Sequence, residues 1–231
     1  MEIKIIANDG DVLFDTFCTA QALESGFSSY GVDVGALKHI VISHEHWDHT
    51  GGLWWILERN KRITVYVCAD TGADIKQRIT DSGAMPVAVT NPLEIKPGLF
   101  TTGQIEGSYN GSAIFEQALI LKQESKLAVV TGCSHPGVPK ILSRTRSEHK
   151  GEIDLLLGGF HLMDKPPEVI RRITVMFDRV YGITHIAPLH CTGSGAVNYF
   201  KKTIPHRMLE VSCGDSLEFD HRASTWKPKK H

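Results

Sequence analysis

Residues 44–49 read His-Glu-His-Trp-Asp-His and directly follow the apolar run Ile40-Val41-Ile42. The pattern His-x-His-x-Asp-His places three imidazoles and the Asp48 carboxylate, all able to bind a metal ion, within six residues. A solvated polar turn does not require this, so the hexapeptide predicts a metal site. Side chains two residues apart at the end of a strand point to the same side, and His44 and His46 are therefore expected to converge on one ion. Asp48 and His49 are expected in the turn before the next helix, where they can face a second ion.

An apolar strand followed by a histidine-bearing loop and a helix occurs at three further places in the sequence. These are the strand 127–130 with His135, the strand 153–157 with His161, and the strand 183–187 with His190. In sheets covered by helices, ligands gather beyond the carboxyl ends of the strands, because loops diverge there and helix N-termini offer free N–H groups. We therefore expect these histidines to lie near the hexapeptide.

Further apolar patterns indicate the fold class. Shorter strands are expected at 3–6, paired with 12–14 across a turn at 8–11, and at 63–67, 119–121 and 208–211. Helices are expected over 53–57, weakly over 71–79, after Pro139, from Pro166 or Pro167 to Gly182, and through Tyr199. Strands with recurring helices predict an α/β protein in which two packed sheets are covered by helices, a four-layer α/β/β/α sandwich. No linker or repeat divides the chain, so residues 1–231 are expected to form a single domain.

Composition excludes several classes of function. The formal net charge of −1 gives no general attraction to nucleic acid or to an anionic membrane. No apolar run approaches a membrane span, and the N-terminus lacks a secretion signal. The five cysteines are odd in number and irregularly spaced, which argues against a disulfide framework and favours the cytoplasm. The basic tail, residues 227–231, is expected to be a solvated end.

The hexapeptide, the segment Thr131-Gly-Cys-Ser-His135 and the Leu189-His190 loop, in this order, resemble the metal-binding motifs of the metallo-β-lactamase superfamily. The likeness covers nearly the whole chain. Residues 131–137, 158–162 and 190–193 are similar to those of a narrower branch, the dihydropterin ribofuranosylaminobenzene 5′-phosphate synthase-like proteins. The resemblance implies the αββα fold and a metal-dependent enzyme.

The resemblance also implies a set of site residues. The first ion would be held by His44, His46 and His135, and the second by Asp48, His49 and His190. Such ligands suit zinc, with manganese or iron as alternatives and one or two ions bound. Asp48 is expected to help orient the attacking water, and His161 to stabilise an oxyanion or protonate the leaving group.

Two departures from the superfamily pattern affect these expectations. Many members carry an aspartate that bridges the ions at the end of the fourth motif strand. This chain reads Leu155-Leu-Leu-Gly-Gly-Phe-His161 there, and neither Asp154 nor Asp164 matches the bridging position. The second ion is therefore expected to bind weakly or not at all, and His161 is a substitute ligand or a group facing the substrate. The usual Asp-Thr-Gly motif reads Asp15-Thr16-Phe17, where Asp15 either orients a ligand histidine or serves only as a turn residue.

Three functions are compatible with this pattern. The first is a hydrolase that uses a metal-bound hydroxide on a small, anionic phosphoester, thioester or lactone-type molecule. The second is a transferase or synthase acting on a phosphorylated pterin-like substrate. The third is a non-catalytic metal-binding or redox-sensing protein that uses Cys133 and Cys191. Residues 68–118 are expected near the mouth of the site, but their sequence identifies no substrate, and the oligomeric state cannot be read from the chain.

Overall fold

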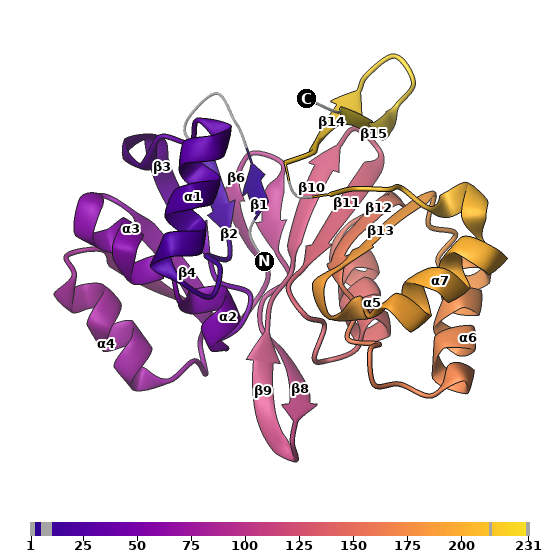
Figure 1. Ribbon diagram of the computed structural model, residues 1–231, viewed down its shortest axis with the longest axis horizontal. Coiled ribbons are helices and arrows are strands. Elements are labelled where there is room, and N and C mark those ends of the chain that lie inside the picture. Colours follow the sequence, from indigo (N-terminus) through magenta and orange to yellow (C-terminus); the bar gives the residue numbers. More distant parts are fainter. Residues whose placement is uncertain (1–2, 6–10, 213, 230–231) are drawn as a thin grey trace.

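Two β-sheets pack face to face, and helices cover the outer face of each one (Figure 1). The computed structural model describes residues 3–5, 11–212 and 214–229. This is the four-layer α/β/β/α sandwich predicted from the sequence. The prediction of a single domain over residues 1–231 includes ends outside the described residues and stays a prediction.

The first sheet has the strand order β1-β2-β3-β4-β5, with β1 antiparallel to β2 and the other neighbours parallel. Its strands are β1 (Ile3–Ile5), β2 (Asp11–Phe14), β3 (Leu37–Val41), β4 (Thr64–Cys68) and β5 (Met85–Val89). Its helices are α1 (Ala20–Tyr30), α2 (Trp47–Thr50), α3 (Leu53–Arg59) and α4 (Ala73–Asp81). The expected pairing of the first two strands is confirmed, whereas most of its turn lies outside the described residues.

The second sheet has the strand order β13-β12-β11-β10-β7-β6. Its strands are β6 (Leu93–Lys96), β7 (Leu99–Thr101), β10 (Leu119–Gln123), β11 (Lys126–Thr131), β12 (Glu152–Gly159) and β13 (His185–Leu189). The strands β11, β12 and β13 are parallel, as expected for units joined by helices. The covering helices are α5 (Val138–Glu148), α6 (Pro167–Val175) and α7 (Ser194–Thr203).

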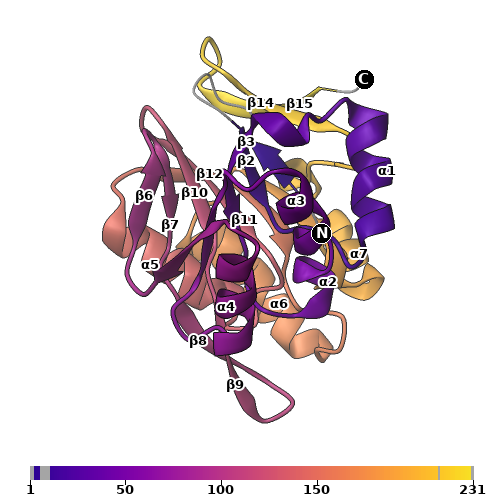
Figure 2. The same ribbon diagram turned by 90° about the vertical axis from the view of Figure 1, so that its left-hand side faces the viewer.

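Two hairpins project from opposite ends of the sandwich (Figures 1 and 2). One consists of β8 (Ile105–Tyr109) and β9 (Ser112–Glu116), and the other of β14 (Ser216–Asp220) and β15 (Thr225–Lys229). The basic tail was expected to be a frayed, solvated end; Lys227 is exposed, as expected, but it is not frayed, because it belongs to β15 and forms an ion pair with Asp220.

The central strands are buried on both faces, which explains their continuous apolar runs. In β11, Leu127 and Val129 pack beneath the helices, whereas Ala128 and Val130 face the opposite sheet. The same alternation in β3 sends Ile40 to the helices and Val41 to the layer between the sheets. This apolar layer joins the two sheets and sets the relative position of their carboxyl ends.

Some expected boundaries are wrong. The last parallel strand was expected at 183–187 but begins at His185, because Gly182 ends the preceding segment with a left-handed φ of 59° and a short link follows. That segment itself ends in a π-helical turn, Met176–Val180. The expected strand at 208–211 forms only an isolated bridge between Met208 and Ile186. Within the described ranges, none of the helices is long and apolar enough to cross a bilayer.

The buried Asp154 attaches the C-terminal hairpin to the second sheet. One of its carboxylate oxygens accepts hydrogen bonds from the Trp226 backbone N–H at 3.0 Å and the Thr225 hydroxyl at 2.9 Å. Asp154→Ala leaves these donors without their acceptor and is expected to lower the free energy of unfolding by about 1–3 kcal/mol. Urea denaturation measures the change, with the exposed Asp164 mutated to alanine as the control. Equal stability of the two variants would contradict this assignment.

Candidate metal centre

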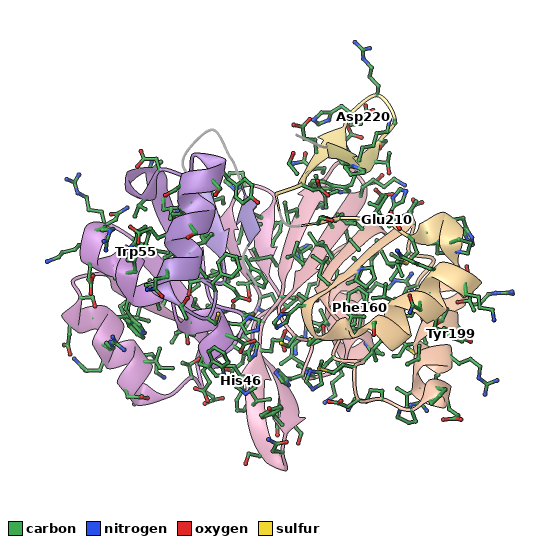
Figure 3. The ribbon with its side chains drawn as sticks, in the orientation of Figure 1. His46, Trp55, Phe160, Tyr199, Glu210 and Asp220 are labelled. Carbon is green, nitrogen blue, oxygen red and sulfur yellow. The ribbon has the colours of Figure 1, made fainter. Side chains whose placement is uncertain are left out.

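The hexapeptide bends away from the end of β3 and enters a helical turn. The strand ends at Val41, so His44 and His46 lie in a loop, and their expected placement on a strand is wrong. Helix α2 begins at Trp47 and carries Asp48 and His49, which were expected in a turn before the helix. The imidazoles nevertheless converge, because His44 Nε2 lies 3.1 Å from His46 Nδ1. Figure 3 places His46 between the two halves of the molecule, close to the β8–β9 hairpin.

A first cluster of metal-capable groups consists of His44, His46 and His135. One ring nitrogen from each lies within 4.8 Å of the other two. The His135 ring centroid is 4.8 Å from each of the other two rings. His135 follows β11, so the packing of the two sheets brings this histidine to the hexapeptide.

A second cluster contains Asp48, His49 and His190, again with donor atoms within 4.8 Å of one another. The Asp48 carboxylate lies 3.3 Å from His49 Nε2 and 3.2 Å from His190 Nε2. The Cys133 sulfur belongs to the same group and is 3.3 Å from His49 Nε2. The fold thus gathers the six ligands expected from the sequence into two clusters, and the Cys133 thiol is an additional donor in the second.

His161 lies beside the first cluster. Its ring centroid is 4.5 Å from that of His135, and its ring nitrogen, the Cys133 sulfur and a His135 nitrogen lie within 4.8 Å of one another. The residue has a left-handed φ of 50°. A side chain at this position faces the site rather than the solvent, which is compatible with either of its expected roles.

Asp15 contacts a candidate ligand, as one of its two expected roles requires. This buried carboxylate lies 2.6 Å from His49 Nδ1 and accepts hydrogen bonds from the Ser43 N–H at 2.7 Å and the Ser43 hydroxyl at 2.8 Å. The following loop packs against helix α2, because a Cβ added at Gly51 or Gly52 would collide with the carbonyls of Cys18 or Thr16. These glycines therefore serve close packing.

A family model for the metallo-beta-lactamase superfamily matches residues 4–120, just over half of the chain. The chain belongs to this superfamily. The αββα fold that the resemblance implied is the fold described above. Its candidate ligands follow the carboxyl ends of strands in both sheets.

Individual relatives fit this membership. A 7,8-dihydropterin-6-methyl-4-(beta-D-ribofuranosyl)-aminobenzene-5′-phosphate synthase of Methanocaldococcus jannaschii is 27% identical over 248 residues, which cover 90% of this chain and 84% of the relative. The crystal structure of Tm1679, a metal-dependent hydrolase of the beta-lactamase superfamily, is 26% identical, with a TM-score of 0.72 and 91% coverage of each chain. Human tRNase Z, short form, shares the fold alone, with 13% identity, a TM-score of 0.57 and coverage of 82% of this chain and 85% of the other.

Superfamily members generally bind divalent metals, and the buried donor atoms of this chain fit such ions. Within the described part of the chain, neither ring nitrogen of His135 has a hydrogen-bond partner, and His161 Nδ1 also lacks one. Buried polar atoms in native proteins are rarely left in this state. An ion in the first cluster would take one nitrogen of His135 as a ligand and remove part of this deficit.

The electrostatics of the first cluster favour the forms that bind metals. Burial and the nearby imidazole of His161 lower the pKa of His135 to about 3. Burial and the imidazoles of His49 and His135 hold the pKa of His44 well below its usual range. Burial also lowers the pKa of His46. These imidazoles are therefore neutral at pH 7, as metal ligands must be.

In the second cluster, contacts between carboxylates and imidazoles together affect the pKa values more than burial does. Burial acts to lower the pKa of His49, but the carboxylates of Asp15 and Asp48 outweigh it and raise the pKa to about 9. Hydrogen bonds with His190 and His49 hold the pKa of Asp48 far below its usual range. An ion at this position would displace the proton of His49 Nε2 and leave the Nδ1 proton directed at Asp15, an arrangement typical of metal-bound histidines.

Glu116 is a supporting residue that the sequence analysis missed. One of its oxygens accepts the N–H groups of Cys133 at 2.9 Å and Ser134 at 2.8 Å, and the other accepts that of His135 at 2.7 Å. Burial outweighs these hydrogen bonds and raises the pKa of Glu116 to about 7. The available signal was a carboxylate directly after the apolar residues Ala113, Ile114 and Phe115, at the end of β9. This carboxylate fixes the backbone that carries His135.

A pocket of about 200 Å³ opens beside the first cluster. Its lining includes His135, His161, Phe160, Ser108 and Lys165. On another side of the cluster, Tyr109 packs edge-on against His46, with ring centroids 4.6 Å apart. Trp47 is 70% exposed. Among the candidate ligands, His44 and His49 are buried, whereas the Asp48 and His190 side chains are 28% and 27% exposed and His135 lines the pocket.

Glu116→Gln places amide hydrogens against backbone N–H groups and is expected to loosen the segment 133–135. Metal affinity of the first cluster should fall about 10- to 100-fold, as it does when outer partners of ligands are lost. Competition with a chromophoric chelator measures this affinity, and circular dichroism checks the fold. The exposed Glu106, in the same hairpin, provides the control Glu106→Gln. Unchanged affinity in Glu116→Gln would show that the loop holds its shape without this carboxylate.

Proposed function

We propose that this chain is a metal-dependent hydrolase that acts on a small anionic molecule, of the phosphoester, thioester or lactone type, at a dinuclear zinc site. Manganese and iron are the alternative metals. The observation that carries the proposal is the meeting of two donor clusters beside a pocket. The first cluster supplies three imidazoles, which leaves a coordination position for water or substrate, as catalytic sites require.

The metal ions would supply an activated water and a Lewis acid at neutral pH. Asp48 lies between His49 and His190, and its exposed carboxylate edge can accept a hydrogen bond from the water and orient it. His161 borders the pocket and the first cluster. In this position its imidazole can donate a hydrogen bond to an oxygen that gains negative charge, or a proton to the leaving group.

The pocket supports an anionic substrate with an apolar part. Lys165 offers a positive charge at its edge, and Phe160, Leu162 and Val169 provide apolar walls. A small molecule with a phosphate or carboxylate group fits both properties. The synthase relative, which is named for a small phosphorylated pterin compound, supports such a small substrate.

His46→Ala removes a half-buried imidazole of the first cluster. Metal-dependent hydrolysis of phosphodiester, thioester or lactone probes is expected to fall by more than about 100-fold, since loss of an outer partner alone costs 10- to 100-fold. In ¹⁸O-labelled water, the wild-type product should carry one labelled oxygen. The exposed His206, changed to alanine, is the control and should retain activity. Activity that survives both chelators and His46→Ala would eliminate this metal centre as the catalyst.

A second candidate is a synthase that transfers or condenses a phosphorylated pterin. The observation that favours it is the relative named as a dihydropterin ribofuranosylaminobenzene phosphate synthase, which is similar over 90% of this chain. In this function the same metal centre would bind the phosphate, and an organic acceptor would take the place of water. The apolar walls of the pocket suit a flat ring.

The two candidates differ in ligand and product. For the synthase, calorimetry should detect binding of a phosphorylated pterin and weaker binding of its dephosphorylated form, and no label should enter from ¹⁸O water. Lys165→Ala should weaken binding about 10- to 150-fold, because a charge-assisted hydrogen bond contributes about 1.5–3 kcal/mol. Lys150→Ala, at an exposed lysine of the loop after α5, should leave it unchanged. Equal affinity for both pterin forms would argue against this candidate.

A further inference from the structure

The proposed ligands carry little negative charge for two divalent ions. Five of the six are histidines, and Asp48 supplies the only carboxylate among them. Cations in a buried site require compensating charge, because desolvation is otherwise costly. The end of β12 cannot supply it, because a Cβ added at Gly159 would collide with the Gly132 carbonyl and the Cys191 sulfur.

Cys133 offers an additional anionic donor inside the second cluster. Its side chain is 4% exposed, and its sulfur is 3.3 Å from His49 Nε2. The sulfur falls within the 4.8 Å limit of the second cluster and, separately, within the same limit of nitrogens of His135 and His161. It therefore lies between the second cluster and His135, the ligand of the first cluster that follows β11.

The backbone holds this sulfur in place. The Cys133 N–H donates to Glu116 Oε1 at 2.9 Å, and the Cys133 carbonyl accepts a hydrogen bond from the Cys191 thiol at 3.3 Å. On the preceding residue, the Gly132 carbonyl accepts the Gly159 N–H at 3.1 Å. These bonds fix the backbone of residues 132–133 and thereby the point from which the Cys133 side chain extends toward His49.

We propose that the Cys133 thiolate would be a ligand of an ion held by the second cluster, where it would supply the negative charge that a bridging carboxylate supplies in many superfamily members. The inference rests on the proposed function in that both require metal ions here. The sulfur–metal bond forms as the thiol releases its proton to solvent. A soft sulfur ligand favours zinc or iron over manganese in the second cluster.

X-ray absorption of the zinc-loaded protein tests the bond directly. The expected spectrum contains a sulfur at about 2.3 Å from zinc. Cys191→Ser is the matched control, because Cys191 adjoins Cys133 but is not a member of the described donor clusters, and it should retain this signal. Cys133→Ser should lose it. With cobalt in place of zinc, the thiolate-to-cobalt absorption in the near ultraviolet should follow the same order.

The affinity for the second zinc ion distinguishes a Cys133 thiol that binds the ion from one with only a structural role. Cys133→Ser should weaken binding of the second zinc equivalent by about tenfold or more, whereas Cys133→Asp, which restores a negative donor, should recover two-ion binding without the sulfur signal. If Cys133→Ser fails to fold, the spectra of the wild type and Cys191→Ser decide the question.

A zinc-loaded wild-type protein without sulfur in the metal shell would overturn the proposal, whether one ion binds or two. Unchanged affinity for the second ion in Cys133→Ser would do the same. Failure of the proposed function is distinguishable, since absence of hydrolysis leaves the sulfur signal intact. Conversely, an active hydrolase whose zinc has no sulfur ligand would support the proposed function and reject Cys133 as a ligand.

Discussion

The apolar contact between the two sheets is the constraint on which the candidate site depends. Val41 from the first sheet and Val130 and Leu157 from the second belong to the same buried layer. This packing brings the loops after β3, β11 and β13 to one end of the molecule. Each donor cluster takes residues from both halves, so neither half could assemble a cluster alone. Ions bound there would link the halves and add stability to their contact.

Two buried carboxylates support the donors from opposite sides. Asp15 belongs to the first half and contacts His49, whereas Glu116 precedes β10 and holds the segment that carries His135. Both are fully buried, and each receives backbone or hydroxyl hydrogen bonds in addition. The geometry of the imidazoles is therefore fixed by polar contacts beyond the donors, as is common for metal sites.

The sequence predicted the parts of this structure that depend on local pattern. Buried parallel strands, the helices after them and the histidines in the loops follow from apolar runs and spacing. The helical turn of α2 within the hexapeptide was not predicted, because its four residues are too few for a periodic signal. Glu116 and Tyr109 were also missed. They reach the site through a hairpin whose placement depends on contacts with distant segments, and neither carries a motif.

The β8–β9 hairpin has a buried, hydrogen-bonded base and an exposed tip. At the base, Glu116 is tied to the backbone under the donors, and Ile105 and Ile114 are buried. Residues 110–113 at the tip are exposed and add no side chain to the apolar layers. Changes in the length or sequence of such loop tips are well tolerated. The tip can therefore be lengthened, shortened or replaced without disturbing Glu116 or the donors that it supports.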